Sequence, residues 1–309
     1  MAGEKRFTSN NKKVLLFMEE EDEFGEALES YATPEAILSF ANSTMKPVNE
    51  AIDVSLKTNT NQPTLCEKLA GREKGALTIS GEVAESNLGS FMKLITHDTT
   101  SPLTVTGTKD VKTFQIVEVF SDGTDELINF AFGCRLDSIK IAGSGNGMLT
   151  YDLAITSLTP ALMQTTTQLP NLPEYADIVV PCADTAFTDV AFSSLAEVNN
   201  FDFTITDNYA SDDVAFLNSN TKSAEYFIGM TGEFNYTRIY NCGNVVENTD
   251  LYKAVLIPET ITIGTDTLLI NYRITDSDSP DQGKDIMIET VKCELVSDAS
   301  NESVTYTIV

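Results

Sequence analysis

Apolar and polar residues alternate with a period of two in many segments that are rich in threonine, valine and isoleucine. This period is typical of β-strands that bury one face and leave the other in water. The clearest segments are 51–56, 76–80, 112–120, 135–141 and 148–155 in the first half, and 201–205, 227–234, 260–263, 267–274, 286–292 and 303–309 in the second. The pattern predicts a mainly β protein.

Two short segments, 86–95 and 248–256, instead show the spacing of amphipathic helices. The first begins with Ser86, a residue type that caps helix N-termini. The apolar faces would be formed by Leu88, Phe91, Met92 and Ile95 in the first segment and by Leu251, Tyr252 and Val255 in the second. Each half of the chain is therefore expected to contain one short helix.

Short sequences recur in the two halves. Ser80-Gly-Glu-Val83 resembles Thr231-Gly-Glu-Phe234 at an offset of 151 residues, and Thr150-Tyr-Asp-Leu153 resembles Thr305-Tyr-Thr-Ile308 at an offset of 155. In both halves the order is a strand, a Gly-Glu strand, a helix, a long hairpin and a closing Thr-Tyr strand. We interpret this order as a tandem duplication of one β-sandwich.

Residues 156–181 contain four prolines and no strong period, which is typical of a linker. The chain has 309 residues, more than a single hydrophobic core usually supports. We therefore expect two tandem β-sandwich domains, residues 1–160 with an N-terminal arm and residues 161–309 with the linker. The polar stretches 59–74 and 207–223 lie at equivalent places and are expected to be long arms.

The chain is strongly acidic, with 46 acidic and 20 basic side chains and a formal net charge of −26. Nucleic acids and anionic membranes are bound by clustered lysine and arginine, so the charge argues against both as specific ligands. A protein that must stay soluble, or must not adhere to DNA, has this balance. The acidic run 19–23 is expected to be a solvated segment or a surface that repels DNA or wrong subunit contacts. No apolar run approaches the ~20 residues that cross a bilayer, and no secretion signal is recognisable, so we expect a soluble protein that stays where it is made.

Residues that could carry out chemistry are scarce. His97 is the only histidine and lies in a polar stretch, where we expect a solvated loop. None of the five cysteines forms a C-x-x-C pair, so they are expected to be reduced and partly buried, without a zinc site. The five are Cys66, Cys134, Cys182, Cys242 and Cys293. We expect neither an enzyme nor a cofactor.

Two further motifs have structural interpretations. The glycines of 143–147 precede a strand instead of a helix, so a tight hairpin is expected there and a phosphate loop is not. Asp276, Asp278 and Asp281 are spaced as calcium ligands can be, but Pro280 and Met287 break the EF-hand pattern. A solvated hairpin tip is the main interpretation, and a weak surface cation site is the alternative.

Several stretches resemble the major tail tube proteins of long-tailed bacteriophages, of the double-domain type. Val14 to Gly25 contains an apolar strand, an acidic run and a Phe-Gly pair, and an Ala-Ile segment and a Met-Lys-Pro follow at 34–38 and 45–47. Asp122-Gly123, with Phe132 to Gly143, is similar to the hairpin and Gly-Cys strand of that family. The layout of 201–309 is similar to the second tube domain.

The resemblance implies a structural virion protein of the phage tail, made in the host cytoplasm. Its sandwiches would join into closed rings, with three chains per pseudo-sixfold ring, and the stacked rings would form a channel through which DNA passes without specific binding. Its partners would be copies of itself and other tail proteins, such as the tape measure, the terminator and a sheath. The arms 59–74 and 207–223 would reach the neighbouring ring.

An acidic lining would repel the phosphates of DNA and let it slide. Glu118, Asp137 and Glu289 are candidates for channel-facing acids, because each lies in a strand with one apolar and one polar face. The alternative interpretations are a head-decoration or minor tail protein and a two-domain immunoglobulin-like adhesin. An adhesin should carry a secretion signal, exposed aromatic residues and paired cysteines.

Overall fold

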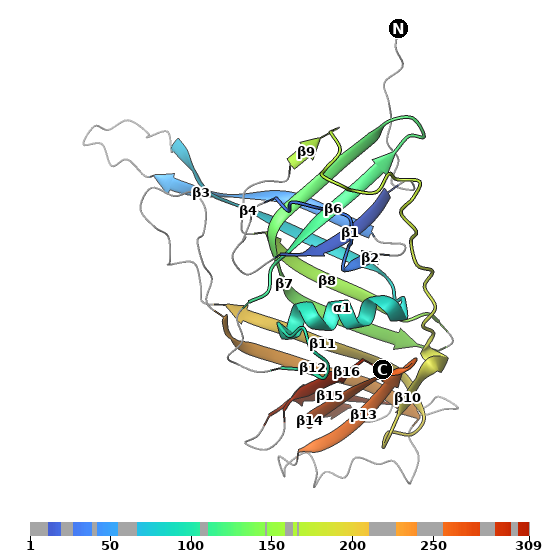
Figure 1. The fold of residues 1–309 in the computed structure, drawn as a ribbon. Coiled ribbons are helices and arrows are strands. Elements are labelled where there is room, and N and C mark those ends of the chain that lie inside the picture. Colours follow the sequence, from blue (N-terminus) through green and yellow to red (C-terminus); the bar gives the residue numbers. More distant parts are fainter. Residues whose placement is uncertain are drawn as a thin grey trace, which may run out of the picture.

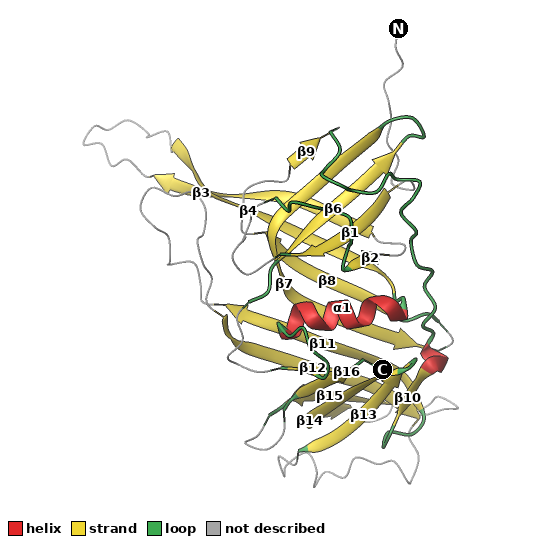
Figure 2. Ribbon diagram, in the orientation of Figure 1, coloured by secondary structure: helices red, strands yellow, loops and turns green. Residues whose placement is uncertain are grey.

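The computed structural model describes residues 12–19, 27–38, 42–54, 67–105, 111–145, 147–157, 163–165, 167–209, 227–239, 256–278, 288–297 and 302–308. The elements of the first half are β1 (Lys12–Met18), β2 (Ala36–Leu38), β3 (Asn42–Val54), β4 (Glu67–Glu82), α1 (Glu85–Thr96), β5 (Leu103–Thr104), β6 (Phe114–Ser121), β7 (Glu126–Ser144), β8 (Thr150–Ser157) and β9 (Met163–Thr165). Those of the second half are a 3-10 turn (Phe187–Asp189), β10 (Val190–Phe192), β11 (Val198–Tyr209), β12 (Phe227–Ile239), β13 (Ile257–Ile263), β14 (Asp266–Asp278), β15 (Ile288–Leu295) and β16 (Val304–Thr307). Strands dominate both halves (Figures 1 and 2).

The predicted mainly β class is confirmed, and each predicted strand segment overlaps an observed strand. The period did not reveal β1, β2, β5, β9 and β10. The last four have two or three residues each, too few to show alternation, and β1 does not alternate because four consecutive apolar residues in it are buried. The predicted hairpin at 143–147 is confirmed: β7 ends at Ser144, Gly145 has a φ of 56°, and β8 follows. Residues 248–255 of the second predicted helix lie outside the described residues.

The first predicted helix is confirmed as α1, and all four residues of its predicted apolar face are buried. Its cap differs from the expectation. The N-cap residue is Ala84, and Ser86 makes no cap. Instead, the backbone N–H of Glu85 donates to Oδ1 of Asp184, at 2.8 Å. A carboxylate from a segment 99 residues away therefore satisfies a free donor of the helix N-terminus.

Eight antiparallel strands form a continuous run through the molecule, in the order β3-β4-β8-β7-β11-β12-β15-β14. The first four strands belong to the first half of the chain and the last four to the second half. The two halves meet where β7 pairs with β11, over seven residue pairs from Asn200↔Ser144 to Thr206↔Ser138. In Figure 1 these two strands lie side by side, with α1 across them.

The order of strand pairing is the same in the two halves. In the first half it is β3-β4-β8-β7-β6-β1, and in the second it is β11-β12-β15-β14-β13-β10. The short strands β9 and β16 pair with β7 and β14 in the same way. The two halves therefore share one topology, in which the long strands β7 and β14 play the same part.

Two glycines define the structural register between the halves. Gly75 of β4 lies opposite Ser157, the last residue of β8, and Gly232 of β12 lies beside Leu295, the last residue of β15. A Cβ atom at either glycine would be in close contact with that neighbour, at 3.0 Å and 2.4 Å respectively. The offset between the halves is thus 157 residues from β4 to β12, so the Gly-Glu match at an offset of 151 is out of register.

An irregularity recurs at equivalent positions of the two long strands. The pairing of β7 with β8 shifts between Leu136 and Ser138, and the pairing of β14 with β15 shifts between Ile274 and Asp276. Such bulges bend a strand and re-aim its side chains. The match of Thr150–Leu153 with Thr305–Ile308 is wrong, because the pairing makes β15, and not β16, the counterpart of β8.

Two separate sandwiches are not confirmed, because the strands form one connected sheet and the main hydrophobic core draws on both halves. Within that core the ring of Phe91 on α1 contacts Tyr151 of β8, at 4.9 Å between centroids. In the second half, Phe234 and Tyr272 make a similar contact, at 5.5 Å. A smaller cluster lies between β1, β6 and the segment after β9, where Leu172 and Ile178 are buried.

The predicted linker range 156–181 contains the end of β8 and the short strand β9, and a long connection follows them. From residue 167 to the 3-10 turn it runs along the side of the molecule (Figure 1). It is held to the first half by Lys13, whose Nζ donates to the carbonyl oxygens of Tyr175 and Ile178, the latter at 2.7 Å. The arm predicted at 59–74 is wrong for Glu67 onward, because β4 begins there; residues 59–66 lie outside the described residues.

We expect Gly143→Ala to destabilise the protein by about 1–3 kcal/mol, because overpacking a filled core has this cost. A Cβ at Gly143 would lie 2.5 Å from Leu149, 2.9 Å from Phe187 and 3.0 Å from Phe201. The measurement is urea unfolding of the purified protein. The control Ser144→Ala, at the exposed end of the same strand, should change stability by less than about 0.5 kcal/mol. Equal effects of the two substitutions would contradict the packing described here.

Candidate functional site

The eight-strand run has one face over the core and one face open to solvent. Because side chains alternate along a strand, the open face can be assigned from burial and pairing. We call it the polar face. Its described members are Asn42, Thr44, Ala76, Thr78, Ser80, Glu82, Arg135, Asp137, Ser138, Lys140, Ala142, Ser144, Thr150, Asp152, Ala154, Thr156, Asn200, Asp202, Thr204, Thr206, Thr231, Glu233, Asn235, Thr237, Arg273, Asp276, Asp278, Thr290, Lys292 and Glu294.

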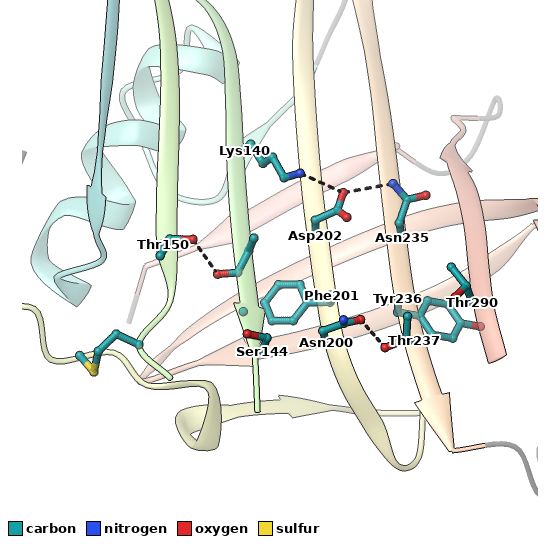
Figure 3. Close-up of a pocket in the computed structure, with 13 residues that line it drawn as sticks. Lys140, Ser144, Thr150, Asn200, Phe201, Asp202, Asn235, Tyr236, Thr237 and Thr290 are labelled. Carbon is teal, nitrogen blue, oxygen red and sulfur yellow. Dashed lines mark hydrogen bonds and ion pairs between the residues drawn. The ribbon is translucent and has the colours of Figure 1, made fainter. Parts of the chain in front are cut away.

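A hollow of about 370 Å³ lies at the centre of the polar face, over the junction of the two halves. Three side chains from neighbouring strands form a row across it: Nζ of Lys140 lies 3.9 Å from Oδ1 of Asp202, which also accepts a hydrogen bond from Asn235, at 3.1 Å (Figure 3). Beside this row Thr237 donates to Asn200. The hollow is thus lined by short polar groups that bind one another across the strands.

Every cation among the described side chains of the polar face is held in an ion pair. The pairs are Lys140 with Asp202, Arg135 with Asp137, Arg273 with Glu294 and Lys292 with Asp276. Four more carboxylates on this face, those of Glu82, Asp152, Glu233 and Asp278, are exposed and lie outside these four pairs. Among its described side chains, the polar face therefore presents twice as many carboxylates as cations, and these cations are already held in ion pairs.

Asp137 is the one sequence-predicted candidate that lies on the polar face. It sits in the bulge of β7, with 31% of its side chain exposed. Its carboxylate accepts hydrogen bonds from Nε of Arg135, at 3.0 Å, and from Thr156, at 2.6 Å. Arg135 is in turn covered by the ring of Tyr209, 3.6 Å from its centroid.

Glu118 lies in β6, outside the eight-strand run, and is only 4% exposed. It accepts hydrogen bonds from Ser43 and Asn129, and Nζ of Lys12 lies 3.5 Å away. Burial raises the pKa of its carboxyl group, and Lys12 opposes that shift. The expectation that Glu118 lies on a solvated strand face is wrong for the single chain, because β1 and β3 cover it.

Glu289 lies in β15 but points to the buried side, with 3% exposure. Its carboxylate accepts hydrogen bonds from Nε of Arg238, at 2.9 Å, and from Ser277, at 2.8 Å. The expectation of a solvated position is wrong here as well. The alternation in 286–292 did not distinguish the faces, because the buried face itself contains an ion pair.

His97 is buried at 4% exposure, so the predicted solvated loop is wrong. It ends α1 in the left-handed conformation, with a φ of 55°. Its Nε2 lies 2.9 Å from Oδ2 of Asp207 in β11, and its Nδ1 accepts from the backbone N–H of Lys112. Burial raises the pKa of Asp207, and the contact with His97 opposes the shift. The helix of the first half is thereby fastened to a strand of the second.

The structure also places the acidic run, three cysteines and the candidate cation ligands. Glu19, the first residue of the acidic run, is buried and accepts a hydrogen bond from the N–H of Gly133, at 2.8 Å; 20–23 lie outside the described residues. Cys134 and Cys293 are buried free thiols and Cys182 is exposed. Of the candidate cation ligands, Asp276 pairs with Lys292 and Asp281 is not described. In the described chain no metal-binding group of three acids, cysteines or histidines is present, and no helix could span a membrane.

The comparisons assign a family to this architecture. The family model of phage tail tube proteins matches residues 68–298, about three quarters of the chain. The chain therefore belongs to the phage tail tube protein family, and it is a structural component of a phage tail. No curated protein matches it. The matched range contains the whole polar face except Asn42 and Thr44 of β3.

Two ion pairs of similar length should contribute differently to the free energy of unfolding. We expect Glu289→Ala to cost about 3–5 kcal/mol, because it leaves the buried guanidinium of Arg238 without its partner. The matched control is Glu294→Ala, which removes an exposed pair with Arg273 of nearly the same length, 2.8 Å, and should cost less than about 1 kcal/mol. Denaturant unfolding of both variants measures the difference. If Glu294→Ala lowers the free energy of unfolding as much as Glu289→Ala does, the buried pair does not carry the greater stabilisation.

Proposed function

We propose that the protein is the major tail tube subunit, that its rings contain three chains, and that the polar face lines the channel through which DNA passes. The main support is the repetition of one strand order in the two halves, with the halves already joined edge to edge through β7 and β11. Two equivalent halves per chain make a three-chain ring pseudo-sixfold. In this proposal residues 1–160 and 161–309 are tandem copies of one tube module, which acts as a scaffold and not as an enzyme.

The dimensions of such a ring suit DNA passage. Three copies of the eight-strand run would form a closed barrel of 24 strands. With strands about 4.8 Å apart and tilted by about 40°, the backbone radius of that barrel is about 24 Å. After side chains are allowed for, the lumen would be about 40 Å across, which leaves room for a DNA duplex. Closing the barrel would also remove the free strand edges that a single chain leaves exposed.

The charge of the polar face supports its place in the lumen. Duplex DNA carries one phosphate per about 1.7 Å of its axis, and free lysines or arginines would hold it by releasing counterions. Among the described side chains of the polar face, the cations are neutralised by neighbouring carboxylates, and the remaining charge is negative. Such a wall repels the phosphates weakly and evenly. Asp137 remains a candidate wall residue, whereas Glu118 and Glu289 would face the channel only if assembly rearranged their surroundings.

Electron microscopy of the purified protein tests the assembly. We expect rings that stack into hollow tubes, with a threefold or pseudo-sixfold outline in end views. Tail proteins that cap or measure the tube would limit its length in the virion, so tubes grown from this chain alone should vary in length. A protein that stays monomeric at all concentrations, or that forms solid fibres without a lumen, would overturn the proposal.

The lining is tested by reversing exposed charges at its centre. We expect Asp152→Lys with Glu233→Lys to leave tube assembly intact and to slow DNA ejection, because free cations would attract phosphate. The delay should shrink as salt screens the attraction. The matched control is Glu29→Lys with Glu174→Lys, the same change of charge at exposed positions off the polar face. If both double variants eject DNA at the wild-type rate in low salt, the polar face does not line the channel.

A further inference from the structure

The helix α1 belongs to the first half of the chain but is tied to the second half at both of its ends. At its N-terminal end, Oε1 of Glu85 accepts hydrogen bonds from the backbone N–H of Thr265, at 2.6 Å, and from the hydroxyl of the same residue, at 2.8 Å. Gly264 and Thr265 form the turn between β13 and β14, and a Cβ atom at Gly264 would collide with the carboxylate of Glu85. The first turn of α1 is therefore fitted closely to a hairpin of the second half.

The C-terminal end of α1 is tied to the junction itself. Nδ1 of His97 accepts from the backbone N–H of Lys112, so the ring proton lies on Nε2, which donates to Oδ2 of Asp207, at 2.9 Å. The same oxygen accepts from the hydroxyl of Tyr209, at 3.0 Å, and the ring of Tyr209 covers the guanidinium of Arg135. Asp207 and Tyr209 belong to β11 and Arg135 to β7. This end of the helix is thus joined to both strands that connect the halves.

Between these two ends, α1 contacts the second half again. A Cβ atom at Gly89 would lie 2.9 Å from Cδ1 of Ile308, so the helix and the residue that follows β16 are in close contact. After α1 the chain continues into β5, which pairs with β16 over two residue pairs. These ties are spread along a helix of 12 residues, which is about 18 Å long and lies across β7 and β11 (Figure 1).

The pairing of β7 with β11 fixes the spacing and the register of the halves, but it leaves the angle between them variable. Adjacent strands of a sheet are rotated relative to one another by anything from about 10° to about 35°, so two paired strands alone permit many angles. A helix that is bound on both sides of the junction removes this freedom. We propose that α1 is a brace that sets the rotation from the first half to the second, and that this rotation determines how many chains close a ring.

The brace rests on the proposed three-chain ring and gives a reason for its closure. Six modules complete a circle only if each is rotated by about 60° from its neighbour, and three of the six junctions lie within chains, under α1. An error of about 10° at each of these three would add up to about 30°. At the barrel radius of about 24 Å, this is a gap or overlap of about 13 Å, more than two strand spacings. Accurate closure therefore needs a junction that is stiffer than two paired strands.

The angle between the halves can be measured in the single chain with two spin labels. Suitable exposed positions are Thr124→Cys in the turn between β6 and β7 and Ala191→Cys in β10. Three native cysteines are replaced by serine so that the labels attach only at the new positions: Cys66, Cys182 and Cys242. We expect a narrow distribution of distances by pulsed electron paramagnetic resonance, at protein concentrations too low for ring formation.

Breaking one tie should widen this distribution. We expect His97→Leu to widen it at least about twofold, because Asp207 loses the donor that holds the helix and the junction regains its range of twist. His97→Gln keeps a side-chain donor for Asp207 and should keep the wild-type width. The matched control is Lys93→Ala, which removes an ion pair of the same helix, with Glu35 at 2.8 Å, whose partners both belong to the first half. It should leave the width unchanged. If His97→Leu and the wild-type chain give equal widths, α1 does not brace the junction.

Ring closure gives a second measurement, at the other end of the helix. We expect Glu85→Ala to lower the fraction of closed three-chain rings in electron micrographs at least about threefold, with open arcs and rings of other sizes in their place. Lys93→Ala, the same control, should form rings as the wild-type chain does. If the wild-type chain forms rings and Glu85→Ala and His97→Leu close them equally well, the brace is wrong and the ring stands. If the wild-type chain forms no rings, the ring and the role of α1 in closing it are overturned together.

Discussion

The pairing of β7 with β11 is the constraint on which the rest of the structure depends. β7 is long enough to pair with β6 and β9 over its first half and with β8 and β11 over its second. A slip of one residue at this junction would turn Ile139 and Ile141 out of the core and Lys140 into it. The buried side chains therefore fix the register, and α1 locks it, because Thr265 in the second half donates to Glu85 at one end of the helix while His97 contacts Asp207 at the other.

The carboxylates on the two faces of the eight-strand run have different roles. On the buried side, carboxylates are matched with specific donors, as Glu289 is with Arg238, and their loss is a loss of stability. On the polar face the pairs of Arg273 with Glu294 and of Lys292 with Asp276 are about half exposed, so they add little to stability and mainly neutralise the cations. The pair of Arg135 with Asp137 is more buried. The overall charge of −26 thus conceals two populations of acids, one that holds the fold together and one that determines what the surface attracts.

Much of the fold was accessible from the sequence, because alternation over five or more residues marks a strand in any context. The period found the long strands and α1, and the acidic composition agreed with the family. The period of alternation, however, did not show which polar positions face solvent. Glu118 and Glu289 alternate as surface residues do, but strands far away in the sequence cover them, and Ser43 and Arg238 replace water. The duplication was visible, but its register was not, because the contacts of Gly75 and Gly232 determine it and the Gly-Glu motif does not.

The connection from residue 167 to the 3-10 turn joins two equivalent modules into one polypeptide. In an assembly of separate modules, every contact between modules forms between free molecules. The connection makes every second one of these contacts intramolecular, at a local concentration that free modules would not reach. It also guarantees a one-to-one ratio of two modules that are no longer identical. Each module is then free to diverge, so one can carry β10 and the other β1 and β2 at the same place, and neighbouring sectors of an assembly can present alternating surfaces to whatever docks on its outside.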